Sequence, residues 1–317
     1  MPLSLLSIAC LKLRRIIGRA LLLPLLLVLG ACGTVRLAYD QAPTLMYWWI
    51  DGYADISSEQ TPALREGIDR WFAWHRRTQL PDYAVLLARA QREVLEPTTA
   101  ASACVWQADI ERRLYGAAGE AVPAAAELML SLSPEQLLHI ERRMAKGLAK
   151  ARAEFLQPDL AERKALSLKR SIDRFETLYG RLDSAQRERL SAALATSSFD
   201  PERWLAEREL RQRDMLRMLA SVSALGRTAG DREVARQQAQ AAARSITERT
   251  TQSPRADYRT YQLRLRQDNC QLAAAMHNAT SPTQRQAARS KLKGWEADVR
   301  ALIANPASID SGAVNRQ

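Results

Sequence analysis

The sequence predicts an all-α protein, an irregular bundle of many helices, on three observations. Ala, Leu, Arg, Glu and Gln, all good helix formers, dominate the composition. Glycine and proline are sparse, with 13 of each in 317 residues, and runs of β-branched residues are almost absent beyond the N-terminus. Apolar residues recur at spacings of three and four, the period of a helix with one buried face. A hydrophobic content of 47% and a charged content of 26% are typical of a folded globular chain.

Residues 1–31 have the layout of a signal peptide. A basic stretch precedes an apolar run from Ala20 to Leu29, broken only by Pro24. This run is too short to cross a bilayer, which takes about 20 residues. The cations of the segment, which holds no acid, are Lys12, Arg14, Arg15 and Arg19. The pattern therefore predicts a signal that is removed, not a transmembrane helix.

The segment Leu29-Gly30-Ala31-Cys32 resembles a bacterial lipobox, in which small residues precede an acylated cysteine. Cys32 is then the mature N-terminus, and its covalent lipid, such as palmitate, anchors the chain in the membrane. The alternative is an ordinary secretory signal with a chance cysteine. In the second position of the mature chain an Asp would retain a lipoprotein in the inner membrane, but this chain has Gly33 there. The expected location is therefore the outer membrane, on its periplasmic side. Apart from this lipid, no cofactor is expected.

The net charge of +11 falls to +7 without the four cations of the signal. A basic chain in the cytosol would suggest a nucleic-acid partner. An exported chain is separated from nucleic acid, so no nucleic-acid partner is expected. The expected partners are the lipid bilayer and an unidentified protein of the cell envelope.

Two cysteines remain in the exported chain beyond Cys32, namely Cys104 and Cys270. In an oxidising compartment two thiols suggest one disulfide. It would close a loop of 166 residues and stabilise the fold by about 5 kcal/mol on the chain-entropy model. The alternative is two separate buried thiols in two helices. No cysteine or histidine spacing indicates a metal site.

An aromatic helix is predicted to begin at Ala42, after a short tether over residues 32–41. One apolar stripe follows the helical period and comprises Ala42, Leu45, Met46, Trp49, Ile50 and Tyr53. Tyr47 and Trp48 lie off this stripe. Either the helix is buried between two others, or Tyr47 and Trp48 face lipid headgroups or a partner. The segment from Gly33 to Gln41 reaches at most about 30 Å, so the domain stays close to its membrane.

A helical domain is expected over residues 42–304. Its aromatic-rich core at 42–95 would hold a helix from about Glu59 to Gln79, ending before Pro81, and a third apolar stripe from Tyr83 to Val94. Residues 229–252 carry almost no large apolar side chain, which predicts an exposed or flexible helix. The polar tail at 305–317 is expected to be disordered.

Four helix starts carry a capping box, in which the N-cap side chain and the N3 glutamine each bind the other's backbone N–H. Their N-cap and N3 residues are Ser57 and Gln60, Ser133 and Gln136, Asp183 and Gln186, and Ser281 and Gln284. Their uneven spacing excludes a regular solenoid.

No catalytic motif is present, so no catalytic residue is assigned. His75 lies on an apolar helix face, which favours a hydrogen-bonded core histidine over a catalytic one. The alternative is a cell-envelope enzyme that uses His75 with a carboxylate such as Asp69 or Asp82, and it requires a pocket in which those groups meet.

Several segments resemble an uncharacterised family of proteobacterial lipoproteins, known only as a domain of unknown function. The resemblance is carried by Arg36–Tyr39, Leu45–Tyr53, Trp74–Arg77 and Leu80–Tyr83. It implies a lipoprotein and brings no activity. The helix start Leu132–Gln136 is also similar to the motif of helical periplasmic chaperones of the Spy/CpxP type. The expected function is therefore a non-enzymatic binding, scaffold or chaperone-like module.

Overall fold

The computed structural model of the protein describes residues 34–304. Eleven helices and no strand make up this part of the chain, which confirms the all-α prediction. In chain order they are α2 (Thr34–Ala54), α3 (Thr61–Glu93), α4 (Ala100–Glu120), α5 (Val122–Ser131), α6 (Pro134–Phe155), α7 (Leu160–Tyr179), α8 (Ser184–Ala195), α9 (Pro201–Thr228), α10 (Arg232–Thr251), α11 (Ala256–Asn278) and α12 (Pro282–Ala304). The predicted signal, the lipobox with Cys32 and the predicted tail lie outside the described residues.

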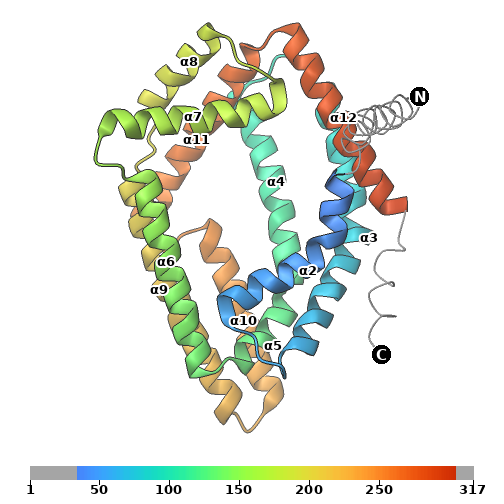
Figure 1. Ribbon diagram of the computed structural model, residues 1–317, viewed down its shortest axis with the longest axis vertical. Helices are drawn as coiled ribbons and strands as arrows, with labels where there is room; N and C mark the ends of the chain where they lie inside the picture. Colours follow the sequence, from blue (N-terminus) through green and yellow to red (C-terminus); the bar gives the residue numbers. More distant parts are fainter. Residues whose placement is uncertain (1–33, 305–317) are drawn as a thin grey trace, which may run out of the picture.

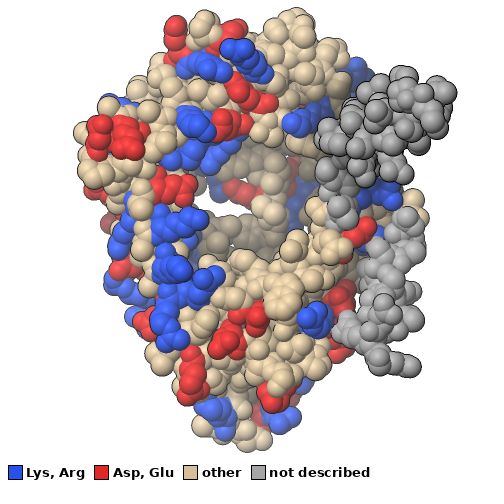
Figure 2. Space-filling view, in the orientation of Figure 1, with Lys and Arg blue, Asp and Glu red and all other residues tan. Residues whose placement is uncertain are grey.

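The helices are arranged as a ring (Figure 1). Helices α6 and α9 form one side, and α3 with α12 and α2 forms the other. Helices α7 and α8 lie at one end and α5 with α10 at the opposite end, while α4 packs against α11. Figure 2 shows the molecule hollowed near its centre. Accordingly, the apolar core is divided into several clusters around the ring.

All four predicted pairs form the reciprocal bonds of a capping box, three of them at helix starts and that of Ser57 and Gln60 in the turn before α3. At each of them the N3 glutamine Oε1 accepts the N-cap backbone N–H at 2.9–3.0 Å. The N-cap side chain accepts the N3 backbone N–H in return. These bonds satisfy donors that a helix start otherwise leaves unpaired, so the starts of α6, α8 and α12 and the turn before α3 are fixed locally.

The four boxes meet in two pairs at opposite ends of the ring, and we call these places the lower pole and the upper pole. At the lower pole, the Gln60 and Gln136 amides exchange hydrogen bonds of 3.1 and 2.7 Å. At the upper pole, the Gln186 and Gln284 amides exchange bonds of 2.7 and 3.0 Å. One glutamine therefore caps its own helix and binds the facing turn at the same time.

The same amides also reach the facing backbone. Each Nε2 donates, at 2.7–2.9 Å, to the carbonyl two residues before the opposite N-cap; the four carbonyls belong to Ser131, Asp55, Ala279 and Arg181. The two poles thus share one hydrogen-bond pattern, although the paired boxes lie 76 and 98 residues apart.

Helix α2 begins at Thr34 and not at Ala42. Most of the segment predicted as a tether is therefore helical, and Pro43 lies inside the helix instead of in its first turn. Tertiary contacts account for the extension, since Tyr39 packs with Phe72 of α3, with ring centroids 5.6 Å apart.

Helix α3 runs through Pro81, so the predicted break before this residue is wrong. A proline inside a helix removes one hydrogen bond and costs about 3 kcal/mol. Leu80 and Ala84, on either side of the proline, are buried against Val299 and Leu302 of α12. Packing on both sides of Pro81 offsets the local cost, which sequence rules based on neighbours alone do not include.

Helix α10 is ordered by small residues. Ala235, Ala239 and Ala243 share one face at four-residue spacing and are buried. Ala239 and Ala243 belong to the cluster with α5, α6 and α9. The prediction of a helix over this stretch is confirmed, but one of its faces belongs to the core.

Candidate functional site

Helix α2 presents three large apolar side chains to solvent. Leu45, Trp48 and Trp49 are 60%, 59% and 61% exposed. Spacings of three and four residues place them on one side of the helix. Helix α2 crosses the front of the ring in Figure 1, and the surface over it in Figure 2 is mostly uncharged. A contiguous apolar surface of this kind is typical of an interaction site.

Tyr47 lies on the opposite side of α2 and is buried, with 7% of its surface exposed. Its ring belongs to an apolar cluster with Leu64, Ile68 and Phe72 of α3. The Arg65 guanidinium stands 3.8 Å from the ring centroid. Of the two residues proposed for an outward contact, Tyr47 is therefore part of the core, whereas Trp48 has the exposure that such a contact needs.

The apolar stripe that contains Leu45 and Trp49 is not the buried side of α2. A helix that is apolar on every side contains more than one stripe of the correct period. Periodicity therefore identifies the helix but not its buried side. The position of α3 decides which side of α2 is buried, because α3 covers the side that carries Tyr47.

A basic surface on α6 adjoins α2. The His139 Nε2 lies 3.4 Å from the Gly52 carbonyl of α2, and the Arg143 guanidinium lies 5.4 Å from the Tyr53 ring. The exposed cations of this surface are Arg142, Arg143, Lys146 and Lys150. Figure 2 shows blue atoms of Lys and Arg on the side of the ring where α6 lies, beside the uncharged surface over α2.

His75 is enclosed by aromatic rings. Its centroid lies 4.8 Å from that of Trp71, 5.8 Å from that of Tyr39 and 5.4 Å from that of Tyr83. The Tyr39 hydroxyl and Nδ1 form a hydrogen bond of 2.9 Å. Burial raises the pKa of Tyr39 to about 12 and outweighs the lowering by Arg76, so the phenol stays protonated. Burial also lowers the pKa of His75. These contacts are those of a neutral core histidine.

The carboxylates named with His75 do not join it. Asp69 is exposed on α3. Asp82 forms a two-bond ion pair with Arg113 of α4, at 2.5 and 3.0 Å. The enzyme alternative therefore gains no support from the residues on which it depended.

His277 has a similar environment at the upper pole. Its Nε2 donates to the Glu96 carbonyl at 2.7 Å, so its Nδ1 accepts the Tyr179 hydroxyl at 2.8 Å. Burial lowers the His277 pKa; the Glu96 carbonyl opposes this effect and Arg285 adds to it. His277 is a fixed neutral imidazole that joins α7, α11 and the loop before α4.

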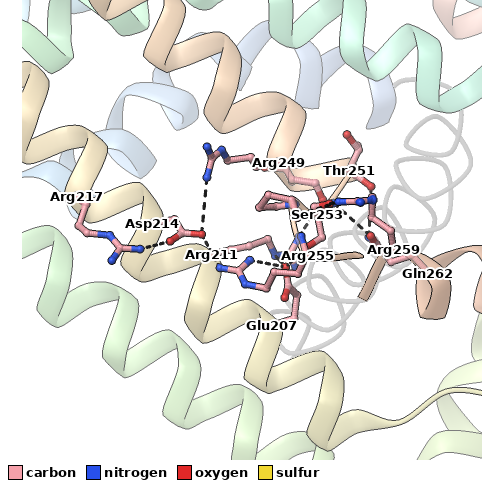
Figure 3. Close-up of polar contacts among 12 residues, drawn as sticks. Glu207, Arg211, Asp214, Arg217, Arg249, Thr251, Ser253, Arg255, Arg259 and Gln262 are labelled. Atoms are coloured by element: carbon pink, nitrogen blue, oxygen red, sulfur yellow. Dashed lines mark hydrogen bonds and ion pairs between the residues drawn. The ribbon is translucent and has the colours of Figure 1, made fainter. Parts of the chain in front are cut away.

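An ionic cluster lies where the end of α10 and the start of α11 meet α9 (Figure 3). Glu207 is 2% exposed and accepts from Ser253 Oγ at 2.7 Å and from Arg255 Nη1 at 3.0 Å. Arg255 also binds Asp214 at 2.5 Å. Two more arginines donate to the backbone carbonyls of residues 250, 253 and 254, namely Arg211 and Arg259. These cations hold the turn between α10 and α11, which is a structural role.

Cys104 of α4 and Cys270 of α11 are joined by a disulfide, with their Cα atoms 5.3 Å apart. Nearby, Thr98 and Asn278 exchange two bonds of 2.8 Å between backbone and side chain. The disulfide and these bonds fasten the loop before α4 to the end of α11, beside the upper pole.

Among residues 34–304, no group of three or more His, Cys, Asp or Glu side chains is placed to hold a metal ion. Within the same range, no helix has both the length and the apolarity needed to cross a membrane.

Comparison with known proteins gives one match. The model of a family of unknown function, DUF6279, matches residues 52–229, more than half of the chain. No curated protein and no solved structure matches the chain. The matched range includes α3 to α9 and three of the four capping boxes. The chain therefore belongs to the DUF6279 family of unknown function.

Proposed function

We propose that this protein is a bacterial lipoprotein, anchored by acyl chains on Cys32 at the periplasmic face of the outer membrane, and that it acts by binding. One observation carries this proposal: α2 begins at Thr34, two residues after the predicted acylation site. Helix α2 also packs on α3 through Tyr39 and Tyr47. An anchor at Cys32 would therefore lead directly into a helix of the ring and hold the whole domain at the lipid surface.

A role as a scaffold or chaperone-like module fits the helical architecture. Four capping boxes, one of them similar to the helix start of Spy/CpxP-type chaperones, fix the turns of a ring with exposed surfaces on several helices. The partner that this role implies is another protein of the envelope. Catalysis through His75 is disfavoured by its aromatic enclosure and by the ion pair of Asp82 with Arg113.

Acyl labelling and fractionation test the anchor. Cells that express the full chain are fed labelled palmitate, and their envelope membranes are separated from soluble material. The natural chain should carry the label and sediment with the outer membrane, whereas Cys32→Ser should lose the label and keep its signal uncleaved. A Cys32→Ser chain that is processed and fractionates as the natural chain does would contradict the proposal. Cys104→Ser/Cys270→Ser is the matched control and should keep the label.

A further inference from the structure

The outer face of α2 is uncharged along its exposed length. Gln41, Leu45, Trp48, Trp49 and Gly52 are all exposed. Gln41, Leu45, Trp48 and Gly52 follow each other at spacings of three and four residues, and Trp49 lies four residues after Leu45, so all five lie on one side of the helix. Tryptophan and leucine on an exposed helix face are the residues that insert at a lipid–water interface, where the indole ring lies at headgroup depth.

The cations of α6 border this face. Arg142, Lys146 and Lys150 follow each other at four-residue spacing, so they form one stripe. All three are exposed, and none has an ion-pair partner among residues 34–304. In Figure 2 their helix lies beside the uncharged surface of α2, on the same side of the molecule. An apolar strip with free cations next to it complements a surface of anionic headgroups.

We propose that the α2–α6 face, formed by Leu45, Trp48 and Trp49 of α2 with Arg142, Lys146 and Lys150 of α6, binds an anionic lipid surface. This inference rests on the proposed function and states how the anchored ring is oriented. The two peptide units from Cys32 to Thr34 span at most about 7 Å. Helix α2 rises about 16 Å from Thr34 to Leu45 and about 22 Å from Thr34 to Trp49. The α2 part of the face therefore lies within about 30 Å of the anchor and on the anchored helix itself, which favours lipid as its occupant.

Vesicle sedimentation tests the face without the anchor. The chain from residue 32 onward, which contains every described residue, carries Cys32→Ser so that no acyl chain is present. It is mixed with vesicles of phosphatidylcholine alone or with phosphatidylglycerol added. Binding should require phosphatidylglycerol and weaken in high salt. Trp48→Ser/Trp49→Ser should weaken it about tenfold, and Arg142→Gln/Lys146→Gln/Lys150→Gln should weaken it about a hundredfold, at about 1 kcal/mol per cation.

Matched variants change the same chemistry elsewhere. Val85→Ser/Leu263→Ser removes two exposed apolar side chains, and Arg244→Gln/Arg289→Gln/Lys293→Gln removes three exposed cations. Both should bind as the parent does, and circular dichroism should show that every variant is folded.

Three outcomes would overturn the inference. They are absence of binding to anionic vesicles, equal binding to neutral ones, and equal losses in the control variants. A dimer that Trp48→Ser/Trp49→Ser dissociates in sedimentation velocity would also overturn it, because the face would then join two copies. Labelling at Cys32 is a separate measurement, so a failed anchor and a failed face are distinguishable.

Discussion

The lower and upper poles are built alike, but the helices that lead into them differ. Helix α2 precedes the first box of the lower pole, and α7 precedes the first box of the upper pole. Each provides a tyrosine hydroxyl that is hydrogen-bonded to a buried histidine, Tyr39 to His75 and Tyr179 to His277. The inner contacts of the two helices are therefore comparable.

The outer faces of these two helices are unlike. Helix α7 exposes charged side chains, among them Glu162, Lys169 and Asp173, and the last two form an ion pair of 3.1 Å. Helix α2 exposes Trp48 and Trp49. Since α7 leads into its pole with a charged outer face, the fold does not require an apolar one. The fold therefore does not account for the exposed aromatic side chains of α2, which supports the proposed contact with a lipid surface.

The poles also differ in how they are fastened. The upper pole lies beside the Cys104–Cys270 disulfide and the paired bonds of Thr98 and Asn278. The lower pole depends on close packing, where Ser223 Oγ donates to the Leu132 carbonyl at 2.6 Å. This difference yields predictions that separate the two ends of the ring.

Removal of the disulfide should give the largest effect. Cys104→Ser/Cys270→Ser opens a loop of 166 residues and should lower the free energy of unfolding by about 5 kcal/mol. Urea unfolding measures the loss. Amide hydrogen exchange should accelerate first around Thr98 and Asn278, at the upper pole. Equal acceleration at Gln60 and Gln136 would show that the two ends do not open separately.

A methyl group at Gly226 should destabilise the packing of α9 against α5 at the lower pole. A Cβ there would stand 1.9 Å from the Leu130 carbonyl oxygen of α5, which is backbone and cannot move aside cheaply. Gly226→Ala should therefore cost about 3 kcal/mol. Gly116→Ala, in α4, meets nothing within 4 Å and should instead stabilise by up to about 1 kcal/mol. Similar unfolding midpoints for the two variants would refute the close approach of α9 and α5.

The glutamine pairs test whether the poles are equivalent. Gln136→Ala and Gln186→Ala each leave a backbone donor, a facing carbonyl and a partner amide unsatisfied, and each should cost about 2 kcal/mol. Gln237→Ala, exposed on α10, is the matched control and should change stability by less than about 0.5 kcal/mol. If only one pole responds, the shared hydrogen-bond pattern is not what stabilises the other.

The smallest effect concerns pH. Burial lowers the pKa of both His75 and His277 below the ordinary value of 6.5. The unfolded chain therefore binds more protons below pH 6.5, so stability is full above that pH and falls as the pH drops through 6.5 towards the folded pKa values. His277→Gln and His75→Gln should each flatten the decline in urea midpoint between pH 7 and 5. An unchanged slope in the double variant would assign the decline to other groups.

Local features were predictable from the sequence, and non-local ones were not. The helical class and the four capping boxes follow from composition and from contacts within four residues, as at Ser133 and Gln136. The pairing of Gln136 with Gln60 depends on residues 76 positions apart, which no local rule addresses. Rules based on neighbouring residues predict a helix end before Pro81, because they do not include the packing of α12 against Leu80 and Ala84.

The candidate site was predictable in part for the same reason. The aromatic composition of α2 predicted either a helix buried between two others or an outward contact through Tyr47 and Trp48, and Trp48 is exposed. It did not distinguish Tyr47 from Trp49, because both lie on apolar stripes and only the position of α3 decides which one is buried. The basic stripe of α6 was not predictable as part of the site, because only the contact between His139 and Gly52 shows that α6 lies beside α2.

The depth of Trp48 in a bilayer is the most direct measure of how the ring is oriented. A nitroxide is attached to Trp48→Cys in the acylated protein, reconstituted into vesicles that contain phosphatidylglycerol, with Leu263→Cys as the matched exposed site on α11. Electron paramagnetic resonance then compares collisions with oxygen, which concentrates in lipid, and with a water-soluble nickel complex. We predict that oxygen dominates at residue 48 and the nickel complex at residue 263. Equal access of the nickel complex to both sites would show that α2 faces water, contrary to the proposed orientation.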